Sequence, residues 1–487
     1  MNILMVVSEL SPFVKSGGLA DMVSALSKSL STSRHDVRIV LPRYYRIDRK
    51  ELQVLPGVLI CNIGCNEYYT QVFETKLPNS NAIVYFIDYE QYFGRDGIYG
   101  QGEISDFHDN AARYSLLSHA ALKTCLKQSW MPDIIHVHDW QASLLPSLIK
   151  YSHQYPQFKD VKTVLTIHNM GYQGVYSKEW FPNTGLDWNV YYPSGFEDRD
   201  RINFLKAGIT CADKITTVSP TYAEQIKTQD YGFGLDGILR AREKDVSGIL
   251  NGIDVNIWNP QKDELIASKY AKSSIANKSV NKKALQEKMS LPIADDVPII
   301  GMVTRLSEQK GIAELFAANY GSAYAIARDM RLQFAIIGEG EAWCEKELLS
   351  LSRQLPNFRV FIGYDETLSH LLQAGSDFFL MPSKYEPCGL SQMYAMRYGT
   401  IPIVRRTGGL ADTVEKYNEQ TGEGTGFMFD YLSPSSIYDT VGWACFAYYN
   451  KQTHIKKMRI RCMEKDFSVA TSASKYIELY ESMIASK

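Results

Sequence analysis

The sequence predicts an α/β protein made of two doubly wound, Rossmann-like domains that face each other across a cleft. Short apolar runs rich in β-branched residues alternate with segments of helical period, which is typical of a parallel sheet covered by helices. A polar stretch at residues 256–296 interrupts this alternation, which then resumes. We therefore expect an N-terminal domain at residues 1–255, a second domain at residues 256–462, and a C-terminal helix at residues 463–487 that packs back on the N-terminal domain.

Each expected strand is a short apolar run bounded by polar or turn-forming residues. In the first domain these runs are residues 2–7, 36–41, 82–87, 133–137, 162–167 and 214–218. In the second domain they are residues 298–304, 332–337, 358–362, 377–381 and 400–404. Since ligands of such folds bind at the carboxyl edge of the sheet, we expect functional residues in the loops that follow these strands.

Composition excludes several classes of protein. The chain has 487 residues with 52 Lys plus Arg and 54 Asp plus Glu, a net charge of −2 without the basic excess of a nucleic-acid-binding protein. The eight cysteines form no C-x-x-C motif, which argues against a zinc site and a disulfide framework. The apolar run at residues 3–7 is too short for a signal peptide and no run is long enough to span a membrane. We expect a cytoplasmic protein, or a plastid protein if a transit peptide has been removed.

A nine-residue motif occurs once in each expected domain. Residues 15–23 (Lys-Ser-Gly-Gly-Leu-Ala-Asp-Met-Val) and residues 406–414 (Arg-Thr-Gly-Gly-Leu-Ala-Asp-Thr-Val) are identical at six of nine positions. Each copy follows an expected strand, carries a cation before its glycines and opens a helix. Glycines allow close approach of the backbone to a ligand, and a helix N-terminus offers free N–H groups with partial positive charge. The motif indicates anion binding in both domains, although packing of a strand-helix turn would explain either copy alone.

Other phosphate-binding signatures do not occur. The loop after the first strand lacks G-x-G-x-x-G, and residues 338–343 begin like that motif but place Trp343 in the third glycine position. A P-loop sequence is also missing. Asp198 and Asp200 resemble a metal-binding D-x-D pair, but their charged surroundings favour a solvated surface, and we expect neither a metal nor a cofactor.

Cations and free amides would then have to stabilise a departing diphosphate. Arg305 and Lys310 follow the strand at residues 298–304, where Arg can bind two oxygens of one phosphate and Lys acts as a point charge. A solvated surface is the alternative for this pair. In residues 382–394, a helix expected to start near Cys388 or Gly389 would leave the amides of residues 388–390 free for a ligand, with Glu386 just before them as a sugar-binding group or a helix cap.

These segments together resemble the bacterial glycogen synthases and plastid starch synthases, the ADP-glucose-type glycosyltransferases of family 5. The resemblance runs in family order from residue 1 to about residue 415, and Glu386 is followed eight positions later by Tyr394, as in that family. The matching segments are residues 15–19, 138–140, 166–169, 203–208, 218–222, 250–254, 386–390 and 406–410, together with Arg305 and Lys310.

The resemblance implies a GT-B fold and a retaining, metal-independent α-1,4-glucosyltransferase that extends the non-reducing end of an α-1,4-glucan from ADP-glucose. The family reaction is front-face attack, in which the leaving phosphate accepts the proton of the acceptor. The implied catalytic residues are Asp139, His168, Arg305, Lys310 and Glu386. The implied donor-binding residues are Lys15, Gly17, Gly18, Asp21, Asn251, Arg305, Lys310, Tyr364, Cys388, Gly389, Leu390, Thr407, Gly408 and Gly409, and the acceptor-binding candidate is Tyr99.

Some of these assignments have structural alternatives. His168 alone at a strand end would be interpreted as structural, and Tyr364 is placed equally well to stack on adenine or to pack. His136 and His138 lie on one face of a strand, but no third metal ligand is evident. Two other functions also stay open: a nucleoside-diphosphate-sugar epimerase of the same fold, and an inactive glucan-binding or priming homologue. The choice of ADP over UDP rests on the resemblance.

Overall fold

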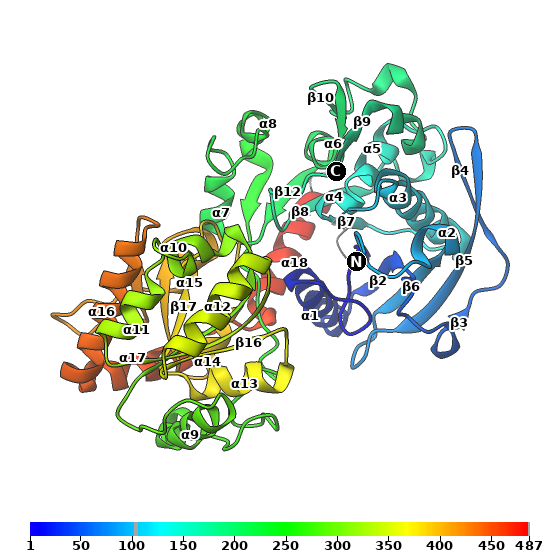
Figure 1. Ribbon diagram of the computed structural model, residues 1–487. Coiled ribbons are helices and arrows are strands. Elements are labelled where there is room, and N and C mark those ends of the chain that lie inside the picture. The colour runs from blue at the N-terminus through cyan, green and yellow to red at the C-terminus, as the bar shows by residue number, and fades with distance from the viewer. Residues whose placement is uncertain (102–105, 486–487) are drawn as a thin grey trace. The chain divides into compact units, whose positions relative to one another are not determined.

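A computed structural model describes residues 1–101 and 106–485 (Figure 1). The chain divides into two compact units: unit 1 consists of Met1–Gly252 and Val469–Lys487, and unit 2 of Ile253–Ser468. Each expected strand is confirmed, with ends that differ by at most three residues. The largely parallel sheet of unit 1 and the parallel sheet of unit 2, both covered by helices, confirm the doubly wound α/β class within each unit.

The main sheet of unit 1 is parallel from β13 to β6 and antiparallel beyond β6, in the order β13-β12-β8-β7-β1-β2-β6-β5-β3, with β4 paired to β5. Its antiparallel part was not predicted from the sequence. The small sheet β10-β11-β9 is antiparallel as well. The strands are β1 (Asn2–Val6), β2 (Asp36–Pro42), β3 (Gln53–Val54), β4 (Leu59–Ile63), β5 (Asn66–Lys76), β6 (Ile83–Asp88), β7 (Ile134–His138), β8 (Lys162–Ile167), β9 (Val175–Ser177), β10 (Glu197–Asp198), β11 (Arg201–Asn203), β12 (Lys214–Thr217) and β13 (Val246–Gly248).

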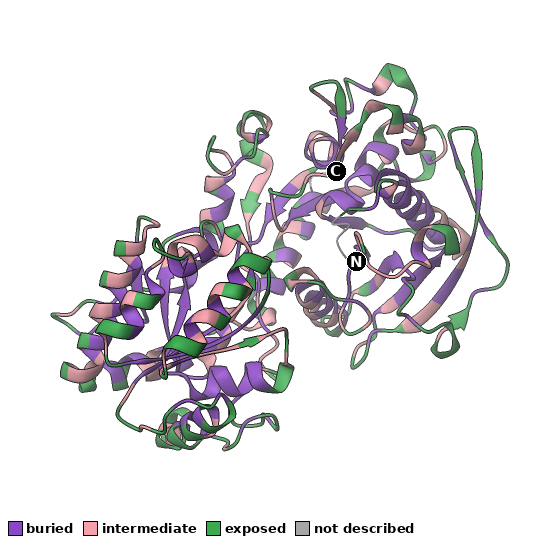
Figure 2. Cartoon of the chain, viewed as in Figure 1, coloured by how far each residue is buried: buried purple, intermediate pink, exposed green. Residues whose placement is uncertain are grey.

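The central strands of unit 1 are buried on both faces because helices cover the sheet (Figure 2). Every residue of β7 is buried, whereas β4 alternates between buried and exposed residues. The helices are α1 (Gly18–Thr32), α2 (Glu90–Phe93), α3 (Asn110–Lys127), α4 (Asp139–Ala142), α5 (Leu144–Tyr151), α6 (Phe204–Cys211), α7 (Pro220–Gln225), α8 (Asp236–Ala241) and α18 (Val469–Ala485).

The C-terminal helix α18 packs against α1 within unit 1 (Figure 1). It buries Tyr476 and Tyr480 completely. The helix begins at Val469 and not at residue 463, because α17 (Gln452–Glu464) occupies the chain up to Glu464 and a non-helical segment follows.

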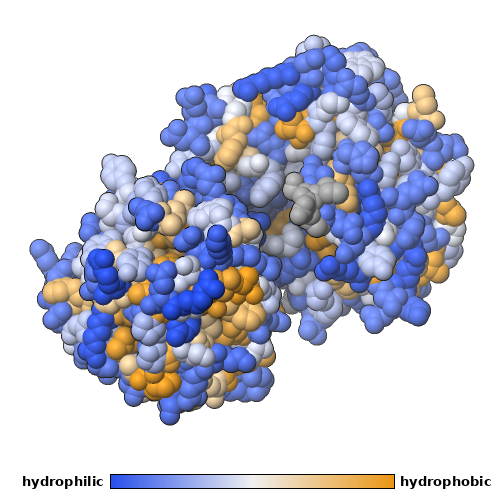
Figure 3. All heavy atoms as spheres, in the orientation of Figure 1, coloured by the Kyte–Doolittle hydropathy of each residue, from blue (hydrophilic) through white to orange (hydrophobic). Residues whose placement is uncertain are grey.

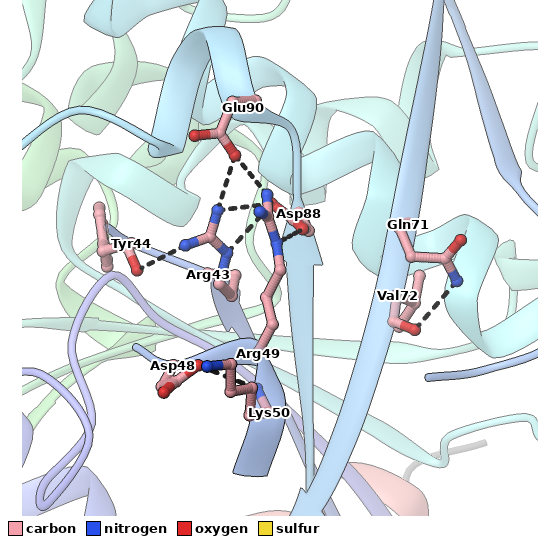
Figure 4. Close-up of polar contacts among 9 residues, drawn as sticks. All are labelled: Arg43, Tyr44, Asp48, Arg49, Lys50, Gln71, Val72, Asp88 and Glu90. Carbon is pink, nitrogen blue, oxygen red and sulfur yellow. Dashed lines mark hydrogen bonds and ion pairs between the residues drawn. The ribbon is translucent and has the colours of Figure 1, made fainter. Parts of the chain in front are cut away.

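An ion-pair network around the buried side chains of Arg43 and Asp88 joins the carboxyl ends of β2 and β6 (Figure 4). Asp88, at the end of β6, accepts from Nε and Nη2 of Arg43 at 3.1 and 2.9 Å and from Nε and Nη2 of Arg49 at 2.7 and 3.1 Å. Glu90, the first residue of α2, accepts from both arginines. Two positive and two negative side chains thus fix the start of the segment at residues 89–101, which carries Tyr99.

Unit 2 contains a fully parallel sheet in the order β16-β15-β14-β17-β18-β19. One continuous hydrophobic core includes Ile300, Phe334 and Phe379. The strands are β14 (Ile299–Leu306), β15 (Gln333–Gly340), β16 (Phe358–Ile362), β17 (Phe378–Met381), β18 (Ile401–Arg405) and β19 (Phe427–Phe429). The helices are α9 (Lys278–Lys288), α10 (Ile312–Phe316), α11 (Ala323–Asp329), α12 (Ala342–Gln354), α13 (Glu366–Gly375), α14 (Ser391–Arg397), α15 (Gly408–Thr413), α16 (Pro434–Asn450) and α17.

The surface is mixed in polarity. Hydrophilic residues cover most of the face of unit 1 in view, with scattered hydrophobic ones (Figure 3). Among residues 1–101 and 106–485, no helix combines the length and apolar character needed to cross a membrane.

Candidate active site

The loop from β1 to α1 surrounds a buried carboxylate that the sequence did not reveal as functional. Glu9 is 3% exposed and accepts from the backbone N–H and, at 2.7 Å, the hydroxyl of Ser16, and from the N–H of Gly17 at 3.3 Å. The N–H of Gly17 therefore already has an acceptor, and Gly18 is the first residue of α1. Lys15 Nζ lies 2.6 Å from Asp21 Oδ2, so these two predicted donor-binding side chains form an ion pair.

Tyr99 belongs to the same polar cluster. Its hydroxyl donates to Glu9 Oε1 at 2.5 Å and lies 2.8 Å from Ser8 Oγ. Burial raises the pKa of Tyr99 well above its usual value, and the charge of Glu9 adds to this shift. The segment at residues 89–101 is thereby joined to the loop that carries Lys15. The predicted contact of Tyr99 with an acceptor stays a prediction.

Asp139 and His168 lie next to each other after the neighbouring parallel strands β7 and β8. Asp139 Oδ1 accepts from the backbone N–H of His168 at 2.7 Å. The φ of Asp139 is 54°, a left-handed conformation that Asp tolerates better than most residues and that often occurs at functional sites. Burial raises the pKa of Asp139 to about 7, while burial lowers the pKa of His168 to about 3. The imidazole of His168 is therefore neutral at physiological pH.

Asn251 is a further polar group of unit 1 available to a ligand. It follows β13 and is 6% exposed. Its Oδ1 has no hydrogen-bond partner in the part of the chain that the structure describes. A buried amide oxygen without a donor is costly, and a ligand hydroxyl would satisfy it.

In unit 2, a cation and a carboxylate meet after two neighbouring strands. Lys310 ends a 3₁₀ turn (Glu308–Lys310) beyond β14, and its Nζ lies 2.6 Å from Oε2 of Glu386, which follows β17. Ser383 Oγ donates to the same carboxylate oxygen at 2.8 Å. Arg305, within β14, is exposed and forms no ion pair with the residues that the structure describes. The structure thus brings Lys310 and Glu386 together and leaves Arg305 accessible.

The segment around Gly389 differs from the expectation in its helix start. Helix α14 begins at Ser391, not near Cys388 or Gly389, because Gly389 has a φ of 71° and interrupts the helical conformation. Within residues 1–101 and 106–485, the N–H groups of Gly389 and Leu390 donate to no protein acceptor. Two free amides therefore follow Glu386 closely in the sequence, and their role in anion binding stays a prediction. Cys388 is buried.

The second glycine motif packs tightly against this segment. Gly409 N–H donates to the carbonyl oxygen of Glu386 at 3.1 Å, so that amide is already used. A Cβ at Gly408 would lie 1.9 Å from the carbonyl oxygen of Glu386, and one at Gly409 would lie 2.0 Å from that of Cys388. Both glycines are thus needed for close backbone packing. Thr407 is buried before them, and Arg406 donates to Asp430 at 2.6 Å.

Two tyrosines of unit 2 have contrasting surroundings. Tyr364, after β16, is 61% exposed, and its predicted stacking on adenine stays a prediction. The ring of Tyr394 instead stacks on Trp258 with centroids 3.8 Å apart, and Trp258 stacks on His370 at 4.0 Å. This three-ring stack accounts for an aromatic residue at position 394.

Comparisons with known proteins show the family to which the chain is similar. Residues 2–241 match the family model for the starch synthase catalytic domain, and residues 284–444 match that for glycosyl transferases group 1. A glycogen synthase of Treponema denticola is 59% identical over 487 residues, covering 100% of this chain and 99% of the relative. Glycogen synthase 1 of Geobacter metallireducens is 42% identical, covering 99% of this chain and 95% of the relative.

Solved structures show the same relationship. The catalytic domain of starch synthase IV from Arabidopsis thaliana, bound to ADP and acarbose, has a TM-score of 0.90 and 32% identity, covering 99% of both chains. Sucrose-phosphate synthase from Thermosynechococcus elongatus, with a TM-score of 0.60 and 17% identity, shares the fold. The two doubly wound units, together with these matches, define a glycosyltransferase of the GT-B fold. The chain belongs to the family of glycogen and starch synthases.

Proposed function

We propose that the protein is a retaining α-1,4-glucosyltransferase that adds glucose from ADP-glucose to the non-reducing end of an α-1,4-glucan without a metal ion. The observation that carries this proposal is the contact of Lys310 with Glu386, which the free amides of Gly389 and Leu390 follow closely in the sequence. Positive charge and N–H donors suit a diphosphate, and a buried carboxylate suits sugar hydroxyls. The ADP-bound starch synthase supports the choice of nucleotide.

The proposed reaction exchanges one bond to the anomeric carbon for another. The bond from glucose C1 to the diphosphate oxygen breaks, and the 4-hydroxyl oxygen of the acceptor forms its bond to C1 on the same face. The hydroxyl proton moves to the departing diphosphate oxygen, so ADP leaves with it. Arg305 and Lys310 stabilise the negative charge that develops on the diphosphate. No protein nucleophile takes part in this step.

The residues of unit 1 offer groups of the kind that a nucleotide-sugar substrate needs. Lys15 and the first-turn amides of α1 contribute positive potential to the diphosphate. Asp139, His168 and Asn251 offer an acceptor, an imidazole and an unpartnered amide oxygen to hydroxyl groups. Glu9 holds the loop that presents Lys15, because three of the groups that it accepts from belong to Ser16 and Gly17.

An assay of ADP release and glucose incorporation tests this function. Purified protein is incubated with ADP-glucose or UDP-glucose, with glycogen, short maltooligosaccharides or no acceptor. We expect release of ADP that depends on the acceptor and equals the glucose incorporated, with ADP-glucose preferred. Conversion of the donor without an acceptor would indicate an epimerase. Failure to release nucleotide with every acceptor would contradict the proposal and favour an inactive homologue.

A further inference from the structure

Three histidines, of which His136 and His138 are buried, form a column along β7 and the end of β8. His136 and His138 are two residues apart on β7, so they share one face of the strand, and their ring centroids are 4.2 Å apart. The rings of His138 and His168 are 5.3 Å apart. His136 and His138 have no solvent exposure. This column ends at His168, which the proposed function places against the donor sugar.

The ring nitrogens of His136 both have partners. Its Nδ1 lies 2.7 Å from the hydroxyl of Tyr480 in α18, and its Nε2 lies 2.5 Å from Thr166 Oγ1. His138 differs, because only its Nδ1 has a partner, Nε2 of His168 at 3.1 Å. The buried Nε2 of His138 has no hydrogen-bond partner among residues 1–101 and 106–485.

The unpartnered Nε2 of His138 identifies which nitrogen carries the proton in the rings of His138 and His168. Burial lowers the pKa values of His138 and His168 well below the usual value, so both rings are neutral and each carries one proton. A buried N–H without an acceptor is costly, and leaving a ring lone pair unpaired costs less, so the proton of His138 lies on Nδ1. That N–H donates to Nε2 of His168, which must then be the acceptor. The proton of His168 therefore lies on Nδ1.

We propose that His138 is a positioning residue that fixes His168 as the Nδ1-protonated tautomer, so that His168 presents an N–H donor to a sugar hydroxyl or phosphate oxygen of the substrate. The inference rests on the proposed function for the identity of the substrate, but the tautomer follows from the contacts of two buried, neutral rings, whatever the substrate is. Asp139 fixes the backbone of His168 through its N–H, and His138 fixes the ring. The orientation of one histidine by a partner on its second nitrogen is a general device in functional sites.

Nitrogen NMR of the imidazole rings tests the tautomer without an activity assay. The protein is labelled with ¹⁵N-histidine, and the His168 signals are identified by their loss in His168→Asn. We expect Nδ1 of His168 to show the chemical shift of a protonated nitrogen and Nε2 that of an unprotonated one. The opposite pattern would overturn the inference, whatever the protein catalyses.

Three variants at position 138 test the positioning role. The Asn amide nitrogen can occupy the place of Nδ1, the Gln amide nitrogen approaches the place of Nε2, and Leu removes the hydrogen bond while filling similar space. We expect kcat/KM for ADP-glucose to fall by about 10- to 100-fold in His138→Leu and His138→Gln, and to recover to within about fivefold of wild type in His138→Asn.

Thermal unfolding midpoints show whether each variant folds, and the Asn and Leu variants are compared only where both do. Equal loss of activity in folded His138→Asn and His138→Leu would overturn the inference, as would wild-type activity in His138→Leu. An inactive wild-type protein would contradict the proposed function instead, and the NMR result would still decide the tautomer.

Discussion

Lys310 Nζ lies 2.6 Å from Glu386 Oε2, and the two side chains are 16% and 7% exposed. The pair joins the loop after β14 to the loop after β17, two strands that are neighbours in the sheet of unit 2. A single contact therefore links the cation proposed to meet the diphosphate with the carboxylate proposed to hold the sugar.

Replacing Lys310 with Ala should reduce kcat by about 10²-fold, the scale for loss of one preorganised charge in a transition state. Steady-state assays of glucose transfer measure this change. Lys272→Ala is the matched control, because Lys272 pairs with Glu464 at 2.9 Å on the surface, and it should leave kcat unchanged. A folded Lys310→Ala variant with wild-type kcat would remove Lys310 from the mechanism.

Asp139 should make stability fall with rising pH. Its pKa is about 7 in the folded protein, against about 3.9 in an unfolded chain. Between these values the folded state holds a proton that the unfolded state has lost, so the contribution of Asp139 to stability declines from about pH 4 to about pH 7. Asp139→Asn, which also tolerates positive φ, should lack this decline.

The difference in thermal midpoint between Asp139→Asn and wild type measures this effect. The midpoint of the variant minus that of wild type should increase as the pH rises from 4 to 7 and stay constant above about pH 8. A difference that does not change with pH would show that Asp139 has an ordinary pKa.

The strand positions of both sheets could be predicted because strands buried on both faces have continuous apolar sequences. The hairpin of β4 and β5 was missed since residues such as Ile60 and Tyr69 face solvent and break such a run. The start of α14 was misplaced because the left-handed φ of Gly389 depends on its surroundings in the fold.

Lys310 and Glu386 could each be singled out because each lies in a recognisable segment after a strand, and the structure places their side chains in contact, while their roles stay predictions. Glu9 was missed because Tyr99, one of its partners, lies 90 positions away in the sequence, and no local pattern marks such a contact. His138 was considered as a metal ligand and as part of the matching segment 138–140, but not as a partner of His168. Its pairing with His168 depends on the alignment of β7 with β8, which the sequence does not state.

Gly409→Ala should disrupt the segment at residues 386–388. The new Cβ would lie 2.0 Å from the carbonyl oxygen of Cys388, and the required shift should cost about 1–3 kcal/mol and reduce kcat/KM for the donor. Gly237→Ala in α8 has nothing within 4 Å of its Cβ and should instead gain up to about 1 kcal/mol from helix propensity. Chemical unfolding of both variants provides the comparison. Equal effects at the two positions would contradict the packing role of Gly409.

Asp88→Ala should destabilise unit 1 by about 3–5 kcal/mol, because it leaves the buried guanidinium of Arg43 without its main carboxylate partner. The control Glu224→Ala removes an exposed carboxylate, 2.7 Å from Lys227, and should cost less than about 1 kcal/mol. Unfolding in urea measures both changes. Similar losses of unfolding free energy in the two variants would show that the network in Figure 4 does not stabilise the carboxyl ends of β2 and β6.

The central claim is that side chains and amides of the protein itself stabilise the departing diphosphate. The most direct test is the initial rate of glucose transfer from ADP-glucose to glycogen, measured after dialysis against EDTA and again with added magnesium or manganese. The account predicts equal rates in the two conditions. Loss of transfer in EDTA with recovery on addition of either ion would contradict it.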